Sequence, residues 1–253
     1  MKPIKISYII ITWNGLHFLR ELLTSMQHQL ERKDVEVVLV DNHSTDGTLD
    51  YLHDHYPALQ PICLPENKGV AYARNIALKQ AKGQYLFIVD NDIRLTDEAV
   101  SGMEQYMDIH PEVGICGCKL ISPTGEVQES CKMYPSLRVK LRSLVNRPMP
   151  STYYRQLIQG TQPFEPVYLI GACQMIRREV YESIGPLDEN IFYGPEDCDY
   201  CLRTRKAGWK IIYLPTITMI HRWQRTTHTK PFSRLGLLHL KALLYFYWKY
   251  KKV

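Results

Sequence analysis

Continuous apolar runs alternate with segments of helical periodicity through the first hundred residues of this 253-residue chain. Four runs are predicted strands: 5–12, 35–41, 61–66 and 84–92. Three intervening segments carry apolar residues at helical spacing and are predicted helices: 16–30, 44–56 and 70–83, the last with Gly83 as its stop signal. Strands that are apolar throughout are typically buried on both faces. The pattern therefore predicts an α/β fold with a Rossmann-like, mostly parallel sheet flanked by helices.

The second half of the chain is less regular, which predicts a mixed arrangement of strands and helices. The predicted helices are 95–111, the later part of 167–185, 196–209 with Gly208 as its stop, and a C-terminal helix in 235–252. The predicted strands are two around the turn SPTG in 113–130, the start of 167–185, 210–215 and 217–221. Residues 131–166 are rich in Pro, Arg and Tyr and fit neither pattern.

Polar side chains follow each of the first four predicted strands, at the point where the strand ends. They are Thr12 and Asn14, then Asp41, then Glu66 and Asn67, and finally Asp90, Asn91 and Asp92. Ligands of open α/β sheets bind outside the carboxyl ends of the strands, so we expect these groups to line one cleft. A polar residue after a single strand is ordinary because loops are generally polar. Here, however, four consecutive strands would bring polar groups to the same edge of the sheet. In extended backbone Asp90 and Asp92 would point the same way and could face one ligand.

The Asp-x-Asp pair suits a hard divalent cation. Mg²⁺ and Mn²⁺ prefer oxygen ligands and are usually held by one or two carboxylates together with substrate phosphates. A cation at Asp90 and Asp92 would act as a Lewis acid toward a diphosphate leaving group. Asp-x-Asp occurs often by chance, and the alternating fold around it makes the motif informative.

Composition is that of an ordinary globular protein and excludes some classes. The chain is 45% hydrophobic and 23% charged, with a net charge of +5. Its seven scattered cysteines favour a reducing, cytoplasmic compartment over a secreted disulfide scaffold. The apolar run at the start is too short for a signal peptide, and no window approaches a membrane span. The mild charge alone does not support binding to nucleic acid.

Five segments, in order and spacing, resemble the family 2 glycosyltransferases with the GT-A fold, in their rhamnosyltransferase-like branch. They are SYIIITWNG, VEVVLVDNHSTDGT, NKGVAYARNIAL, QYLFIVDND, and the stretch from VYLIGACQMIRREVYESIG to KIIYLP that precedes His221. The resemblance implies one GT-A domain over residues 1–225, with a nucleotide-sugar-binding half (1–110), an acceptor half (111–225) and a helical tail (226–253). Residues 131–166 would then be a mobile loop or an acceptor-binding insertion.

The activity implied by this resemblance is a metal-dependent, inverting transfer of a sugar. The donor would be a nucleotide-diphosphate sugar, dTDP-rhamnose or a UDP-hexose. The acceptor would be a hydroxyl of a saccharide or lipid-linked saccharide in the synthesis of a surface or cell-wall polysaccharide. The implied cofactor is Mn²⁺ or Mg²⁺.

The resemblance also assigns roles on the donor side. Thr12 and Asn14 fall on a loop that lines the nucleotide pocket, and Asp41 falls where the family hydrogen-bonds the base. Arg74 falls where a donor-contacting arginine is common, and Asn91 falls on the ribose side.

The metal and the general base are assigned in the same way. Asp90 and Asp92 match the metal and diphosphate motif, and His221 matches a histidine that completes the metal shell or contacts the diphosphate. Glu196 and Asp197 match the acidic pair that carries the general base. An inverting displacement needs one carboxylate to take the acceptor's proton, and we favour Asp197, with Glu196 as the alternative base or an acceptor-orienting group.

Simpler interpretations compete with several of these roles. Asp197 could be an acidic residue in the first turn of a helix, and Arg74 a solvated charge. Cys198 and Cys201, together with His221, could bind zinc, or the two cysteines could face the core.

Other functions also compete with sugar transfer. A nucleotidyltransferase would carry a Gly-rich basic loop where this chain has TWNGLHF. A non-catalytic sugar-binding or lipid-binding module would lack the Glu196 and Asp197 pair.

The segment LGLLHLKALLYFYWKYKK (235–252) is leucine-rich, then aromatic, then basic. It is too short and too interrupted to span a bilayer. Two interpretations stay open. The segment is a helix packed on the domain, or it lies in the membrane interface with its lysines against anionic lipid, which would place the protein peripherally at the inner face of the membrane.

Overall fold

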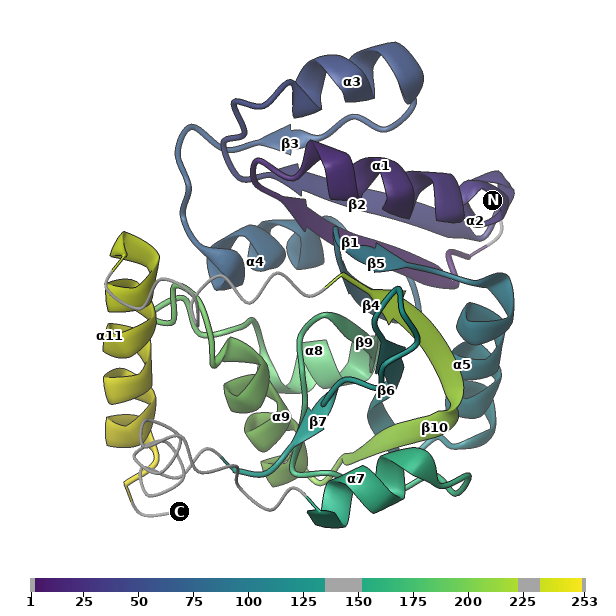
Figure 1. The fold of residues 1–253 in the computed structure, drawn as a ribbon, viewed down its shortest axis with the longest axis vertical. Coiled ribbons are helices and arrows are strands. Elements are labelled where there is room, and N and C mark those ends of the chain that lie inside the picture. The colour runs from purple at the N-terminus through teal and green to yellow at the C-terminus, as the bar shows by residue number, and fades with distance from the viewer. Residues whose placement is uncertain (1–2, 135–151, 223–232, 252–253) are drawn as a thin grey trace.

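The structure is a computed structural model that describes residues 3–134, 152–222 and 233–251. Within these ranges eight strands form one sheet (Figure 1). Their order across the sheet is β3 (Ile62–Cys63), β2 (Val35–Asp41), β1 (Ile6–Thr12), β4 (Tyr85–Asp90), β9 (Cys173–Arg177), β6 (Val113–Ile121), β10 (Lys210–His221) and β5 (Ile93–Arg94). The first four run parallel, whereas β9 is antiparallel to both β4 and β6. The predicted parallel sheet with a mixed second half is confirmed.

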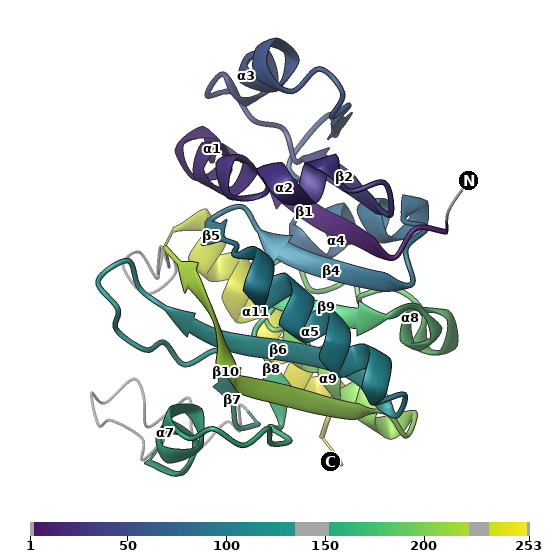
Figure 2. The same cartoon turned by 90° about the vertical axis from the view of Figure 1, so that its right-hand side faces the viewer.

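Helices cover both faces of this sheet, as Figures 1 and 2 show from two directions. The described helices are α1 (Leu16–Ser25), α2 (Gln27–Glu31), α3 (Thr48–His55), α4 (Val70–Gln80), α5 (Asp97–Ile109), α7 (Thr152–Gln159), α8 (Arg178–Ile184), α9 (Glu196–Lys206) and α11 (Arg234–Lys249). Two short strands, β7 (Cys131–Lys132) and β8 (Tyr168–Leu169), pair in a separate small sheet. Among the residues described, no helix is long and apolar enough to cross a bilayer.

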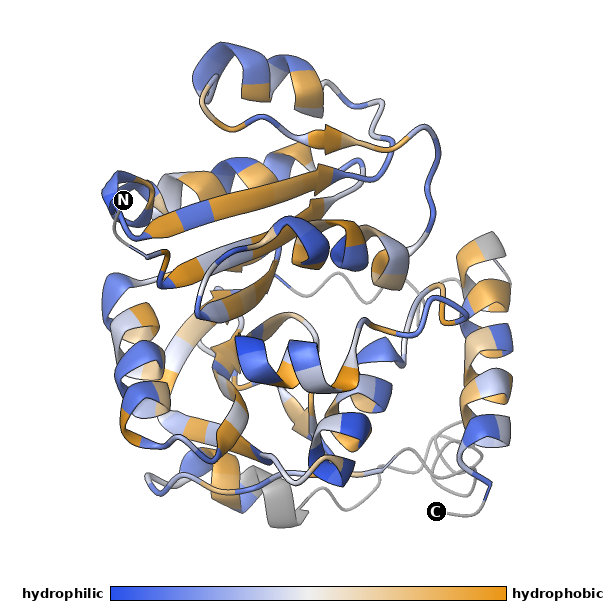
Figure 3. Ribbon diagram, turned by 180° about the vertical axis from the view of Figure 1, so that it is seen from behind, coloured by the Kyte–Doolittle hydropathy of each residue, from blue (hydrophilic) through white to orange (hydrophobic). Residues whose placement is uncertain are grey.

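Each central strand contributes to two hydrophobic clusters. In β4, Tyr85, Phe87 and Val89 pack in the cluster that includes α1 and α5. Leu86 and Ile88 point the other way, into the cluster that includes α4 and α9. Because side chains alternate along a strand, a strand covered on both faces must be apolar at every position. Figure 3 shows these hydrophobic strands between helices with mixed faces.

Some predicted boundaries are wrong. The predicted helix 16–30 is divided at Met26 into α1 and α2, and the strands predicted at 210–215 and 217–221 are one strand, β10, with an irregularity in its pairing. Gly83 does not end α4, which stops at Gln80. A Cβ at Gly83 would overlap the backbone of Ser7, so this glycine permits close approach to β1. Residues 135–151 of the unassigned segment lie outside the described ranges.

Candidate active site

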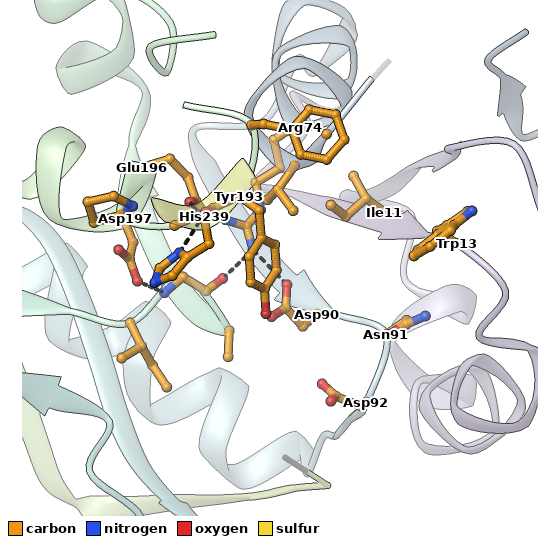
Figure 4. Close-up of a pocket in the computed structure, with 18 of the residues that line it drawn as sticks. Ile11, Trp13, Arg74, Asp90, Asn91, Asp92, Tyr193, Glu196, Asp197 and His239 are labelled. Carbon is orange, nitrogen blue, oxygen red and sulfur yellow. Dashed lines mark hydrogen bonds and ion pairs between the residues drawn. The ribbon is translucent and has the colours of Figure 1, made fainter. Parts of the chain in front are cut away.

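The carboxyl ends of three parallel strands meet at one end of the sheet. Thr12 of β1 lies level with Asp41 of β2, and Ile11 lies level with Asp90 of β4. A pocket with a volume of about 510 Å³ opens there. The predicted site residues that line it are Thr12, Asn14, Arg74, Asp90, Asn91, Asp92, Glu196, Asp197 and His221. Strand ends from the first half and the start of α9 thus share one cavity (Figure 4).

Asn14 holds the loop after β1 against the loop after β2. Its φ of 48° is left-handed, its backbone N–H donates to Ser44 Oγ (2.9 Å), and its Oδ1 accepts from the backbone N–H of Thr45 (2.7 Å). In the same loop, Asp46 accepts from the backbone N–H of Leu16 at the start of α1 (2.9 Å). Asn14 therefore shapes the pocket wall as well as lining it.

Asp41 does not line the pocket. It is 1% exposed, and its Oδ2 accepts from the backbone N–H of Ser44 (2.9 Å). Its Oδ1 is buried and has no hydrogen-bond partner among the described residues. A buried polar atom left unpaired is costly, so this oxygen is suited to accept a hydrogen bond from a ligand or a water molecule. Base recognition by Asp41 stays a prediction.

Arg74 is a buried cation that joins the two sides of the pocket, and it is not a solvated helix charge. Its Nη2 donates to Asp90 Oδ1 (2.6 Å) and to the carbonyl oxygen of Gly171 (2.8 Å), and its Nη1 donates to Glu196 Oε1 (3.0 Å). The residue is 3% exposed. A Cβ at Gly171 would overlap the Arg74 guanidinium, so the contact requires glycine there. The end of β4 is thus tied to the start of α9.

Glu196 and Asp197 begin α9 and differ in their surroundings. Glu196 is 6% exposed, and its Oε2 accepts from the backbone N–H of Gly194. Asp197 is less buried, and its Oδ2 accepts from the backbone N–H of Gly171 (3.0 Å). Burial and then the charge of Asp197 raise the pKa of Glu196 to about 7, although Arg74 opposes the shift. The two carboxyl groups therefore lie in different environments.

This pKa predicts a pH-dependent stability. A glutamate with an ordinary pKa of 4.5 that rises to about 7 on folding binds its proton more tightly in the folded state. Its contribution therefore falls as pH rises from about 4.5 to about 7, by about 3 kcal/mol at most. Glu196→Gln is expected to remove this slope. Urea unfolding at a series of pH values checks it: the stability of the variant relative to wild type should rise across that window, and parallel curves would contradict the assignment.

The sequence predicted that Asp90 and Asp92 lie on one extended strand, and this prediction is wrong. β4 ends at Asp90, and Asn91 and Asp92 form a turn before β5. Asp90 bonds Arg74, whereas Asp92 Oδ1 lies 3.4 Å from His221 Nε2. Both aspartates still line the pocket, because the turn after β4 directs Asp92 toward β10.

The predicted metal ligands are only partly brought together. In the described part of the chain, no group of three or more histidine, cysteine and acidic side chains is placed to hold a metal. Asp90 is engaged by Arg74, and Asp90, Asp92 and His221 as one ligand set stays a prediction.

Asp92 and His221 nevertheless fit a cation. Asp92 Oδ1 is buried and makes no hydrogen bond within the described residues. Gln128 Nε2 donates to the backbone carbonyl oxygen of His221 (2.8 Å). This hydrogen bond orients Gln128 Oε1 toward His221 Nδ1 (2.7 Å). With Gln128 Oε1 accepting at Nδ1, Nε2 on the Asp92 side is the nitrogen that would bind a cation, an arrangement common behind metal-bound histidines. Two protein ligands completed by phosphate oxygens is a usual way to bind Mg²⁺ or Mn²⁺.

The pocket residues that were not assigned from the sequence include Trp13, Lys132, Tyr193 and His239. Burial and the neighbouring carboxylates raise the pKa of Tyr193 to about 12, so its hydroxyl stays a donor beside Asp90 (Figure 4). His239 Nδ1 lies 3.0 Å from the carbonyl oxygen of Tyr193. Lys132 and His239 come from the unassigned segment and from the tail, and no motif marks either one.

The two cysteines of α9 lie in the hydrophobic core. Cys198 and Cys201 are fully buried in the hydrophobic cluster beneath the helix. Burial raises the pKa of the Cys201 thiol to about 12. A thiol that stays protonated is a poor zinc ligand, so the arrangement favours the core interpretation.

Comparison with known proteins agrees with this geometry. The sequence matches Glycosyl transferase family 2 over residues 7–185. It is similar to the N-acetylglucosaminyl-diphospho-decaprenol L-rhamnosyltransferase of Mycobacterium tuberculosis (strain ATCC 25618 / H37Rv), with 27% identity over 94% of this chain and 82% of that protein. It is also similar to the dTDP-rhamnosyl transferase RfbF of Shigella flexneri, with 28% identity over 84% of this chain and 67% of that protein.

Two solved structures share the fold. The mannosyltransferase PcManGT from Pyrobaculum calidifontis, in complex with GDP-Man and Mn²⁺, superposes with a TM-score of 0.64 at 20% identity, over 90% of this chain and 60% of that one. GalNAc-T7 with UDP, GalNAc and Mn²⁺ gives a TM-score of 0.65 at 18% identity, over 88% and 45%. The predicted GT-A architecture is therefore confirmed, and the chain belongs to glycosyl transferase family 2.

Proposed function

We propose that this glycosyltransferase performs a metal-dependent, inverting transfer from a nucleotide-diphosphate sugar to an acceptor hydroxyl. The observation that carries the proposal is the shared pocket. It places the strand ends of the first half opposite the acidic pair of α9, and Arg74 ties the two sides together. A donor held at the strand ends would present its sugar toward Glu196 and Asp197.

The donor side would bind the nucleotide and the diphosphate. Asn91 donates to Thr12 Oγ1 (3.0 Å), which fixes both side chains at the pocket wall. Asp92 and His221 would hold Mn²⁺ or Mg²⁺, and the bound ion would neutralise charge on the departing diphosphate. Asp41, with its unpaired oxygen, is the proposed contact for the nucleotide base, although Asp41 does not itself line the pocket.

Asp197 is the proposed general base. It is the more exposed of the two acidic residues, and its oxygens accept only from the backbone N–H groups of Gly171 (3.0 Å) and Cys198 (2.7 Å). The oxygens of the buried Glu196 are held by the Arg74 guanidinium and by the backbone N–H of Gly194. The acceptor oxygen would form its bond to the anomeric carbon as its proton passes to Asp197 and the bond to the diphosphate breaks. Glu196 would orient the acceptor, and its raised pKa keeps it the alternative base.

The names of two relatives support a narrower donor and acceptor. One is a dTDP-rhamnosyl transferase, and the other is a rhamnosyltransferase of an N-acetylglucosaminyl-diphospho lipid. We therefore propose dTDP-rhamnose, with a UDP-hexose as the alternative donor. The proposed acceptor is a lipid-linked saccharide in the synthesis of a surface polysaccharide.

Donor binding is tested by thermal unfolding with UDP, dTDP and GDP and their sugars, with and without Mn²⁺. Ligand at about a hundredfold excess over Kd stabilises a protein by about 2.7 kcal/mol, which corresponds to a rise in Tm of about 5–10 °C for a chain of this size. We expect such a rise for one nucleotide with Mn²⁺. Asp92→Ala should remove it, and Asp54→Ala, at an exposed position on α3, should not. No rise with any nucleotide would contradict the donor site.

A further inference from the structure

Helix α11 is apolar on two sides. One side packs on the protein, where Ala242 and Phe246 are 2% and 0% exposed. The other side presents four large apolar residues to solvent: Leu237 (56% exposed), Leu240 (53%), Leu244 (61%) and Trp248 (63%). They form half of the exposed large hydrophobic side chains in the described part of the chain, and the others are scattered singly. A helix that is apolar on both sides normally has a partner on each.

The four residues form one stripe, which we call the outer stripe of α11. Their spacing of three, four and four residues places them on one face of the helix. The exposed Lys241 lies on the same face, and the exposed Lys251 follows the helix. No aspartate or glutamate occurs after Asp199 in the sequence. The outer stripe is thus apolar, and the charged residues that the helix itself places beside it are positive.

The inner side of α11 is fixed, so the outer stripe cannot turn inward. Lys249 Nζ bonds Asp188 Oδ2 (2.7 Å) and the buried Asp199 Oδ1 (2.6 Å). Tyr250 donates to Asp199 Oδ1 (2.8 Å), and Tyr245 donates to Asp188 Oδ2 (2.9 Å). These contacts tie the end of the helix to α9 and to the loop before it.

The same helix forms a wall of the active-site pocket. Leu235, His239 and Leu243 line that pocket from α11. His239 also contacts the carbonyl oxygen of Tyr193, three residues before Glu196. Figure 1 shows α11 upright at the edge of the molecule, on the side away from α5. Whatever binds the outer stripe is therefore separated from the pocket by this one helix.

We propose that the outer stripe of α11 docks on a membrane surface that contains anionic phospholipid. An amphipathic helix binds such a surface by burying leucine and tryptophan at the level of the headgroups while lysines contact lipid phosphates. A second copy of this chain fits less well, because a two-fold contact between two such stripes would bring lysines together with no acidic residue on the helix to pair them. The packed interpretation of the tail then describes the inner side of the helix, and the membrane interpretation is the proposal for its outer side.

Docking in this way would place the pocket at the membrane. The headgroup of a lipid-linked saccharide could then reach Asp197 while its lipid stays in the bilayer. This consequence rests on the proposed function, but membrane binding itself does not.

Vesicle sedimentation tests the proposal on the full chain, without donor. The vesicles contain phosphatidylcholine alone, or phosphatidylcholine and phosphatidylglycerol in equal amounts. We expect binding to the anionic vesicles, weakened about tenfold or more when Leu240→Gln and Leu244→Gln are combined. Lys241→Glu should weaken it by about fivefold or more. The matched control is Ile109→Gln, at an apolar residue of α5 that is 66% exposed, and it should bind as wild type does.

Several outcomes would overturn the proposal. One is wild-type protein that stays in the supernatant with anionic vesicles, and another is equal loss of binding in Ile109→Gln. A third is a dimer in sedimentation equilibrium that the double variant dissociates while vesicle binding persists, since the stripe would then bind a second copy. The nucleotide-dependent thermal shift is measured on the same proteins without vesicles. It reports on the donor site alone, so failure of membrane binding and failure of the proposed donor site can be told apart.

Discussion

Asp197→Asn is expected to lower kcat by about two to four orders of magnitude while the affinity for the donor stays within about twofold. The asparagine side chain is nearly isosteric, and its one oxygen can keep one of the two hydrogen bonds that Asp197 accepts from the backbone N–H groups of Gly171 and Cys198. It cannot take a proton from the acceptor hydroxyl. Loss of the base should therefore appear in the transfer step and not in the donor-dependent thermal shift.

Two further variants make this result specific. Glu182→Gln changes an exposed glutamate of α8 outside the pocket and should leave kcat unchanged. Glu196→Gln should reduce kcat less than Asp197→Asn does, because Glu196 is held by Arg74 and the backbone N–H of Gly194. If Glu196→Gln abolished transfer and Asp197→Asn retained it, Glu196 would be the base.

Arg74→Met is expected to lower the free energy of unfolding by about 3–5 kcal/mol, because it leaves buried acidic groups without their cation. Arg74 is 3% exposed and contacts Asp90, Glu196 and the carbonyl oxygen of Gly171. Methionine fills much of the same volume but offers no donor. Urea unfolding at neutral pH measures the loss, and Lys79→Met, at an exposed position on the same helix, is the control.

A double-variant cycle separates the charge from the packing. Combining Arg74→Met with Glu196→Gln removes one of the two stranded carboxylates, so the double variant should be more stable than the sum of the single effects predicts. Additive effects would mean that the two side chains are energetically independent, in spite of their 3.0 Å contact.

The first half of the chain was predictable because its physical requirements are local. β1 and β4 lie between two layers of helices, which favours a nearly continuous apolar run, and such a run is visible in the sequence. Registry between parallel strands then brings Thr12, Asp41 and Asp90 to one end of the sheet. Gly83 was misinterpreted because its closest neighbour is the backbone of Ser7, far away in the sequence.

The rest of the site depends on contacts that no local pattern encodes. Arg74 and Glu196 are 122 positions apart, and periodicity on α4 does not show that an arginine points into the interior. The turn after Asp90 redirects Asp92 toward His221, which an extended-strand argument could not foresee. His239 enters the pocket only because α11 packs beside the loop at Tyr193.

The most direct test of the central claim is mass spectrometry of an acceptor incubated with wild-type protein, Mn²⁺ and each nucleotide sugar. The acceptor is a polyprenyl-diphosphate N-acetylglucosamine, with free saccharides in parallel. We predict that one donor adds the mass of a single sugar to the acceptor, with release of a nucleoside diphosphate, and that Asp197→Asn forms this product at least about a hundredfold more slowly. A donor that binds but yields no product with any acceptor, or a reaction that releases pyrophosphate instead, would contradict glycosyl transfer at this pocket.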